Sequence, residues 1–315
     1  MSRGLDDDRG DTRADAWSRA PSREPDTRDP DQRSWSLPDV RFSLPSGADR
    51  QSVWGRDRSY RLRDTESHTL ETIGTFHVVF DRDLRDGRYR GDVDRLEDDL
   101  KGLTGQGLVE SRTVHSGHHG HRMRVLALTE AGRDLLDDHR TVSSGRDRDG
   151  EDTVHAGFRK RSDLIHNASL YRMYQVEAAA IERRGGSIRR VDLEDDLKRD
   201  VYHRARLTRS LSEDLREERL VEAARACHIP VVNGHLEFPD VRVEYDMPGG
   251  HGGRVDLELA TAAYRGGAIA AKAAAGFTMY TVGGCASRGM HSLGGSDGGR
   301  GTPSHEHWIS GLLSL

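Results

Sequence analysis

Three carboxylates in the second half of the chain are spaced as a metal site requires. Asp240 follows Pro239 at the head of one predicted strand, and Asp256 and Glu258 lie two residues apart on the next. Residues two apart on a strand point to the same face of a sheet. Carboxylates that converge at one end of a hairpin form a hard-oxygen site suited to Mg²⁺ or Mn²⁺. The sequence therefore predicts a divalent-metal site made of Asp240, Asp256 and Glu258.

A lysine on the following element completes this candidate catalytic set. The Ala-rich residues 267–275 are expected to form a helix that carries Lys272. Its ammonium could orient a water molecule or stabilise charge that develops on a phosphate. The alternative is that Asp240 ends a turn, the two strand acids form a solvated face, and Lys272 is an exposed helix residue.

The elements around these residues are expected to be a strand, a turn, a strand and a helix. Residues 238–245 alternate as a half-buried strand does, and residues 247–253 supply a turn rich in Gly and Pro. Extended apolar character resumes over residues 254–259 before the helix. This order predicts an α/β domain.

The same motifs resemble a known family. The PD pair at Asp240, the DLE run ending at Glu258, the displaced Lys272 and the closing Tyr280 are similar to the bacterial replication-relaxation family of plasmids and mobile elements. The resemblance covers roughly residues 60–280. It implies an amino-terminal winged helix followed by a PD-(D/E)xK nuclease-like domain. It also implies a role in plasmid or mobile-element replication, relaxation or transfer.

The sequence departs from the nuclease pattern at the lysine. A Lys is expected two residues after the second acid, but Leu259 and Ala260 follow Glu258, so the Lys is either missing or replaced by Lys272. Two alternatives stay open: a divalent-metal-dependent DNA endonuclease, or a catalytically degenerate nuclease-like fold that only binds DNA. His166 and Asn167 match the H-N opening of the family's second half.

The first half of the chain predicts a winged helix-turn-helix. Leu70, Ile73 and Phe76 recur at helical spacing, and a later Gly-Leu-Val-Glu run followed by Leu-Thr-Glu-Ala-Gly is typical of the β-wing and the helix after it. The expected elements are a helix ending near residue 76, a strand at 78–80, helices at 81–86 and 91–103, a wing at 107–129, and a helix from 129.

The charge distribution in this half differs from that expected of a winged helix that docks on DNA through its third helix. Acids crowd the third helix at Asp92, Asp94, Glu97, Asp98 and Asp99, so phosphate contacts would have to come from arginines before it, on the wing, or in the later basic stretch. The predicted nucleic-acid contacts are Arg88, Arg90, Arg112, Arg122, Arg124, Arg189 and Arg190. A winged helix that binds a protein partner is the alternative.

Histidines gather at the predicted tip of the wing. They are His115, His118, His119 and His121. They could bind a metal ion, but no Cys or acidic residue stands at ligand spacing, which favours a polar wing tip.

Composition divides the chain into segments. The segments are a disordered arm over residues 1–59, the winged helix over 60–140, a linker over 141–153, a helical and nuclease-like domain over 154–282, a flexible Gly/Ser-rich stretch over 283–304, and a docking helix over 305–315. The fold class is therefore α+β.

Composition also limits the function classes. Only 34% of the 315 residues are hydrophobic, 32% are charged and the net charge is −5, so a nucleic-acid surface has to be local. Two cysteines at no metal or redox spacing, and no long apolar run, predict a reduced cytoplasmic protein without membrane contact. We expect double-stranded DNA as the partner, with relaxase or replication proteins and a homodimer as further candidates. A winged-helix transcriptional regulator and a non-catalytic protein-binding adaptor are the alternatives.

Overall fold

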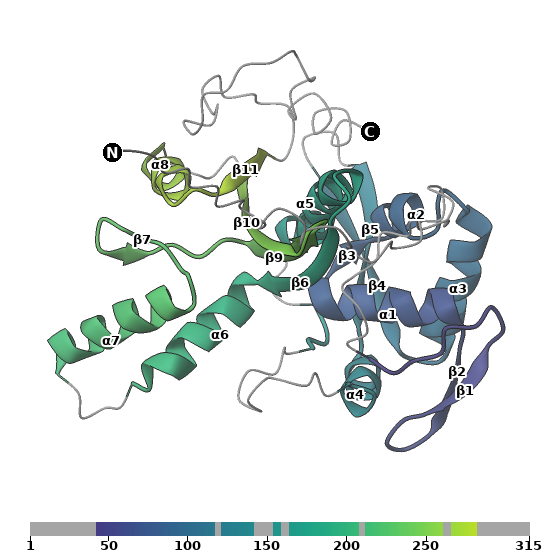
Figure 1. Cartoon of the computed structure of the whole chain (residues 1–315). Helices are drawn as coiled ribbons and strands as arrows, with labels where there is room; N and C mark the ends of the chain where they lie inside the picture. The colour runs from purple at the N-terminus through teal and green to yellow at the C-terminus, as the bar shows by residue number, and fades with distance from the viewer. Residues whose placement is uncertain are drawn as a thin grey trace, which may run out of the picture. The chain divides into compact units, whose positions relative to one another are not determined.

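The protein is described here from a computed structural model with mixed α and β structure (Figure 1). The structure describes residues 42–116, 121–141, 154–158, 164–207, 212–260 and 266–281. The predictions for residues 1–41, most of the linker, the Gly/Ser-rich stretch and the carboxyl-terminal helix lie outside these residues. No helix among the described residues is both long enough and apolar enough to cross a membrane.

The amino half has the element order of a winged helix, which confirms that prediction. Its three strands pair antiparallel in the order β3-β5-β4. The elements are α1 (Asp64–Phe76), β3 (Val79–Phe80), α2 (Asp81–Gly87), α3 (Val93–Gly105), β4 (Val109–Ser116), β5 (His121–Leu128) and α4 (Glu130–Asp138).

Local signals set the ends of these helices. The side chain of Asp92 accepts a hydrogen bond from the backbone N–H of Arg95 at 2.9 Å and so caps α3. Thr129 caps α4 in the same way, because its Oγ1 accepts from the N–H of Gly132 at 3.1 Å. Gly132 is required there, since a Cβ would lie 2.2 Å from the carbonyl oxygen of Leu108.

The predicted disordered arm is too long at its carboxyl end. Residues 51–62 form an antiparallel hairpin of β1 (Gln51–Trp54) and β2 (Ser59–Leu62). Leu62 is fully buried in the core and Phe42 is also buried, whereas Trp54 is exposed. The hairpin is held because its alternating residues Val53, Tyr60 and Leu62 bury one face.

The carboxyl half is built on a four-stranded mixed sheet. Strands β6, β9 and β10 pair antiparallel, β11 pairs parallel to β10, and the order is β11-β10-β9-β6. The elements are α5 (Leu164–Arg183), β6 (Ser187–Leu193), α6 (Glu194–Ala205), α7 (Glu213–Ala226), β7 (Val231–Val232), β8 (His235–Leu236), β9 (Val241–Met247), β10 (His251–Ala260), α8 (Gly266–Ala274) and β11 (Thr278–Thr281).

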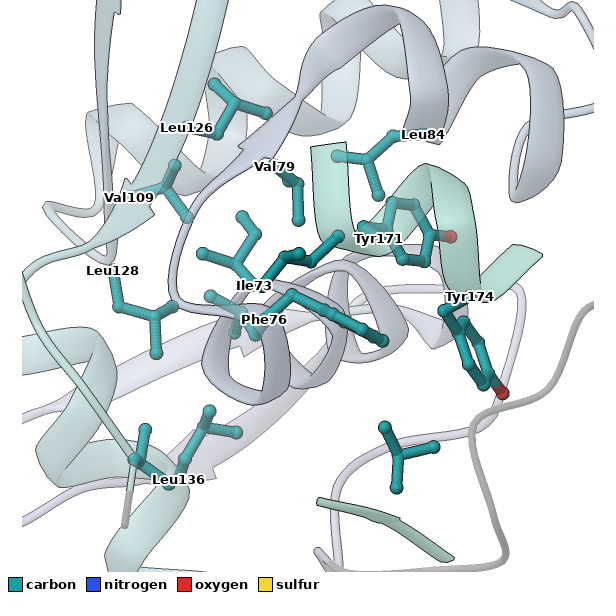
Figure 2. Close-up of a cluster of buried hydrophobic side chains, with 14 of the residues drawn as sticks. Ile73, Phe76, Val79, Leu84, Val109, Leu126, Leu128, Leu136, Tyr171 and Tyr174 are labelled. Atoms are coloured by element: carbon teal, nitrogen blue, oxygen red, sulfur yellow. The ribbon is translucent and has the colours of Figure 1, made fainter. Parts of the chain in front are cut away.

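Helix α5 joins the two halves through a continuous hydrophobic core. Figure 2 shows Phe76 of α1 beside Tyr171 and Tyr174 of α5. The centroid of the Phe76 ring lies 5.1 Å from that of Tyr171 and 5.2 Å from that of Tyr174. Next to them the buried side chain of Arg172 forms an ion pair with Asp83 of α2, with 3.0 Å between Nε and Oδ1. The same helix therefore packs on the winged helix and on the four-stranded sheet.

Candidate functional site

Strand pairing brings Asp240 and Glu258 together. Val241 pairs with Leu257, so Asp240 and Glu258 lie side by side at the adjoining position of the ladder. The backbone N–H of Leu259 donates to Asp240 Oδ2 at 2.7 Å, and the N–H of Asp240 donates to Glu258 Oε2 at 3.3 Å. Each carboxylate is thus hydrogen-bonded to the strand that carries the other.

Lys272 also reaches this pair. Its Nζ lies 3.4 Å from Glu258 Oε1 and donates to the carbonyl oxygen of Phe238 at 2.5 Å. Glu237 is a second acidic neighbour, at 3.7 Å. We call Asp240, Glu258 and Lys272 the acid–lysine cluster. Its position agrees with the predicted displaced lysine, while any catalytic role of these residues stays a prediction.

Asp256 lies outside the acid–lysine cluster because an arginine holds it. Arg242 Nε and Nη2 donate to the two carboxylate oxygens of Asp256 at 2.7 and 2.9 Å. The same guanidinium donates to the carbonyl oxygens of Cys227 and His228. Because Arg242 is buried, it needs this compensating charge. The sequence pattern gave no indication of the pairing, since Arg242 lies on the neighbouring strand.

His166 of α5 contacts the cluster from the helix side. Its Nε2 lies 3.3 Å from Asp240 Oδ1. Burial alone would lower the pKa of His166, but the hydrogen bond to Asp240 and the charges of Asp240 and Glu258 raise it above 6.5. The H-N pair at the start of this helix was the sequence signal for its position.

These residues, as arranged, do not fit Mg²⁺ or Mn²⁺. Both oxygens of Asp240 already have hydrogen-bond partners, Glu258 is 1% exposed, and Asp256 is paired with Arg242. Mg²⁺ needs near-octahedral oxygen ligands and retains several waters. The predicted metal ligands therefore form a closed, internally bonded group.

A cavity of about 290 Å³ adjoins the cluster. Asp240, His166, His77 and Asp195 are among its lining residues. The cavity thus brings together the end of α1, the start of α5 and the start of α6.

The predicted DNA-binding arginines fall into two groups. Arg90, Arg112 and Arg122 are exposed, and among the described residues none of them forms an ion pair. Arg112 also lies over the ring of Phe158, 4.5 Å from its centroid. Arg88 is partly buried, with Nε and Nη2 turned away from solvent.

The other three arginines are bound internally. Arg189 pairs with Glu244 at 2.8 Å, and Arg190 pairs with Asp192 at 2.5 Å. Arg124 bonds both Asp81 and Glu97, and its hydrogen bond to Glu97 raises its pKa. These contacts reduce the charge that the three arginines can offer to a phosphate.

The acidic residues of α3 are largely neutralised. Glu97 pairs with Arg124, and Asp98 pairs with Arg50 at 3.2 Å and with Arg63 at 2.7 Å. The buried Asp99 also bonds Arg63. The partners Arg50 and Arg63 lie far from α3 in sequence, so the sequence pattern could not show this network. Asp92 and Asp94 are exposed at the start of the helix.

The histidines predicted at the wing tip are only partly covered. His115 is exposed on β4. His118, His119 and the side chain of His121 lie outside what the structure describes.

Comparisons with known proteins give little. No protein-family model matches the sequence, and no curated protein matches it. The crystal structure of Bacillus subtilis PadR in complex with operator DNA matches 51% of this chain and 91% of that chain, with 14% sequence identity and a TM-score of 0.19. The winged-helix assignment rests on the element order and strand pairing of the amino half.

Proposed function

We propose that this chain binds double-stranded DNA through its winged helix and carries a nuclease-like domain that has lost an open metal site. The observation that carries the proposal is the charge arrangement of the winged helix. Arg90, Arg112 and Arg122 are exposed and form no ion pair with another described residue. Three of the acids of α3, Glu97, Asp98 and Asp99, are instead paired with Arg50, Arg63 and Arg124.

The positions of the exposed arginines suit contact with phosphates. Arg112 and Arg122 lie on the two strands of the wing, and Arg90 lies in the turn that precedes α3. Wings and the turns before recognition helices touch the DNA backbone in such domains. The ion pairs of Glu97 with Arg124 and of Asp98 with Arg63 lower the repulsion that the α3 surface would otherwise exert on phosphates.

The nuclease-like reading of the carboxyl half is supported by topology. A helix, three antiparallel strands, a second helix and a parallel strand occur in the order α5, β6, β9, β10, α8 and β11, with α6, α7, β7 and β8 inserted between β6 and β9. Asp240, Glu258 and Lys272 meet where the two central strands lie side by side, at the start of β9 and the end of β10. Because internal hydrogen bonds close this cluster, we assign it a stabilising role. A place in plasmid or mobile-element replication, relaxation or transfer rests on the family resemblance of its motifs.

The salt dependence of DNA binding tests the proposal. Each phosphate contact contributes a slope of about −0.9 to the logarithm of affinity against the logarithm of salt concentration. Arg112→Gln with Arg122→Gln should therefore make the slope shallower by about 1.8. Arg189→Gln is the matched control, since it removes an exposed arginine that is paired with Glu244. An unchanged slope in the double variant would contradict the assigned surface.

A protein-binding adaptor is the second candidate function. Val93 at the start of α3 is 49% exposed beside the exposed Asp92 and Asp94, and a protein partner could cover this apolar and acidic patch. Failure to bind DNA even at low salt would favour the adaptor.

A further inference from the structure

We propose that His77, His155 and Asp195 form a binding site for a divalent transition-metal ion such as Zn²⁺. One ring nitrogen from each histidine and one carboxylate oxygen of Asp195 all lie within 4.8 Å of one another. None of its three residues belongs to the acid–lysine cluster, although Asp240 lines the same cavity, and they come from three segments that are distant in sequence.

His77 is fixed at the end of α1. Its side chain is buried, and its backbone has a φ of 65°, a region that residues other than Gly rarely adopt. The N–H of Val78 donates to the carbonyl oxygen of Phe76 at 2.7 Å, which holds the chain tightly around His77. This tight turn of the backbone sets the direction of the His77 side chain.

His155 is held in place by its neighbours on both sides. Val154 is buried in the core, and the N–H of Gly157 donates to the carbonyl oxygen of Leu128 at 2.7 Å. The ring centroids of His155 and His77 lie 3.8 Å apart in an edge-on arrangement. The two imidazole rings are thus in contact, and each is joined to the backbone by a single methylene group.

Asp195 supplies the third ligand from the first turn of α6. It is partly exposed, and it lines the cavity of about 290 Å³ together with His77. The cavity provides the access that an ion needs and room for a water molecule or an exogenous ligand. The site therefore combines the buried His77 with two side chains that are partly open to solvent, His155 and Asp195.

The ligand set selects the class of metal. Two imidazoles and one carboxylate suit Zn²⁺, Co²⁺ and Fe²⁺ rather than Mg²⁺ or Ca²⁺, and three protein ligands leave a coordination position open. Ligand atoms at about 2.1 Å from one tetrahedral ion lie about 3.4 Å apart, so closure requires the ligand atoms to approach one another by up to about 1.4 Å from their present spacing of within 4.8 Å. The ion would tie the end of the first winged-helix helix to the start of α6.

Cobalt titration of the full chain tests the site. The protein is treated with EDTA, dialysed, and titrated with Co²⁺ while the visible absorption of the ion is recorded; Zn²⁺ is then added in competition. We expect one Co²⁺ per chain, displaced by Zn²⁺, and an increase in melting temperature with Zn²⁺. Asp195→Asn and His155→Ala should each weaken binding at least about tenfold, since each removes a direct ligand.

Two control variants separate this site from other metal-binding groups. Glu194→Gln removes the neighbouring carboxylate in the same turn of α6, and His118→Ala with His119→Ala removes histidines of the wing tip. Both should bind Co²⁺ as the unchanged chain does. Asp195→Asn keeps the size of a side chain that is only partly buried, so the variant is expected to fold, and circular dichroism checks this. Absence of stoichiometric binding, full binding by Asp195→Asn with His155→Ala, or loss of binding in the wing-tip variant would overturn the proposal.

Discussion

The buried ion pair between Arg172 and Asp83 should be the strongest polar contact between α5 and the winged helix. The side chains are 9% and 3% exposed, and Arg172 Nε lies 3.0 Å from Asp83 Oδ1. Replacing Arg172 with Met keeps the apolar stem but leaves Asp83 buried without its main partner. Breaking one side of a buried pair typically costs about 3–5 kcal/mol. Arg82 lies 3.8 Å from the same carboxylate, so we expect the lower end, about 3 kcal/mol.

A double variant separates the lost pair from other effects. Asp83→Leu combined with Arg172→Met removes both charges, and its free energy of unfolding should return to within about 1 kcal/mol of the unchanged chain. Urea unfolding followed by far-ultraviolet circular dichroism measures both variants. A cost below about 1 kcal/mol for Arg172→Met, or a double variant as unstable as the single one, would refute the reasoning.

The loss of unfolding free energy in Arg172→Met should itself depend on pH. Burial raises the pKa of Asp83, and Arg172 opposes this shift. A carboxyl group with a raised pKa in the folded state contributes stability that is present below its ordinary pKa and is lost as pH rises through the folded value. Arg172→Met raises that folded value further. The variant should therefore be less destabilised near pH 4 than at pH 7, in the same unfolding assay.

Three further substitutions test the positions around the sites. Lys272→Met should cost about 3 kcal/mol of unfolding free energy, because Glu258 is 1% exposed and loses its cation; a cost near zero would mean that the pair is not formed. The raised pKa of His166 predicts stability that is full below pH 6.5 and lost as pH rises through the folded value, so His166→Gln should flatten the melting temperature between pH 6 and 8. Gly132→Ala should lower the melting temperature, because its Cβ would meet a backbone oxygen at 2.2 Å, whereas Gly105→Ala meets no neighbour and is the matched control.

Local patterns were sufficient for the helices and the wing between residues 64 and 138, although not for the hairpin before them. The helical spacing of Leu70, Ile73 and Phe76 predicted α1, and all three side chains are fully buried. The Leu-Thr-Glu-Ala-Gly run predicted the start of α4, where Thr129 caps the helix and Gly132 avoids Leu108. Such signals are readable because cap and contact lie within a few residues of each other or at a fixed period.

The sites depend on contacts that a single sequence does not reveal. The register of β9 and β10 places Asp240 beside Glu258 and pairs Asp256 with Arg242. Neither neighbour can be predicted from the spacing of these residues along the chain. The proposed ligands His77 and Asp195 are separated by more than a hundred residues, and the tertiary fold brings them together at one cavity. Local periodicity cannot predict such long-range placement.

Incubation of the purified chain with supercoiled plasmid, in Mg²⁺, in Mn²⁺ and in EDTA, separates DNA binding from DNA cleavage in one experiment. We expect the plasmid to stay supercoiled under all three conditions and to be retarded on a gel at low salt, with retardation reduced in the variant that lacks Arg112 and Arg122. Metal-dependent nicking that is lost in Asp240→Asn would contradict the closed site. Plasmid that is neither nicked nor retarded at low salt would contradict DNA binding.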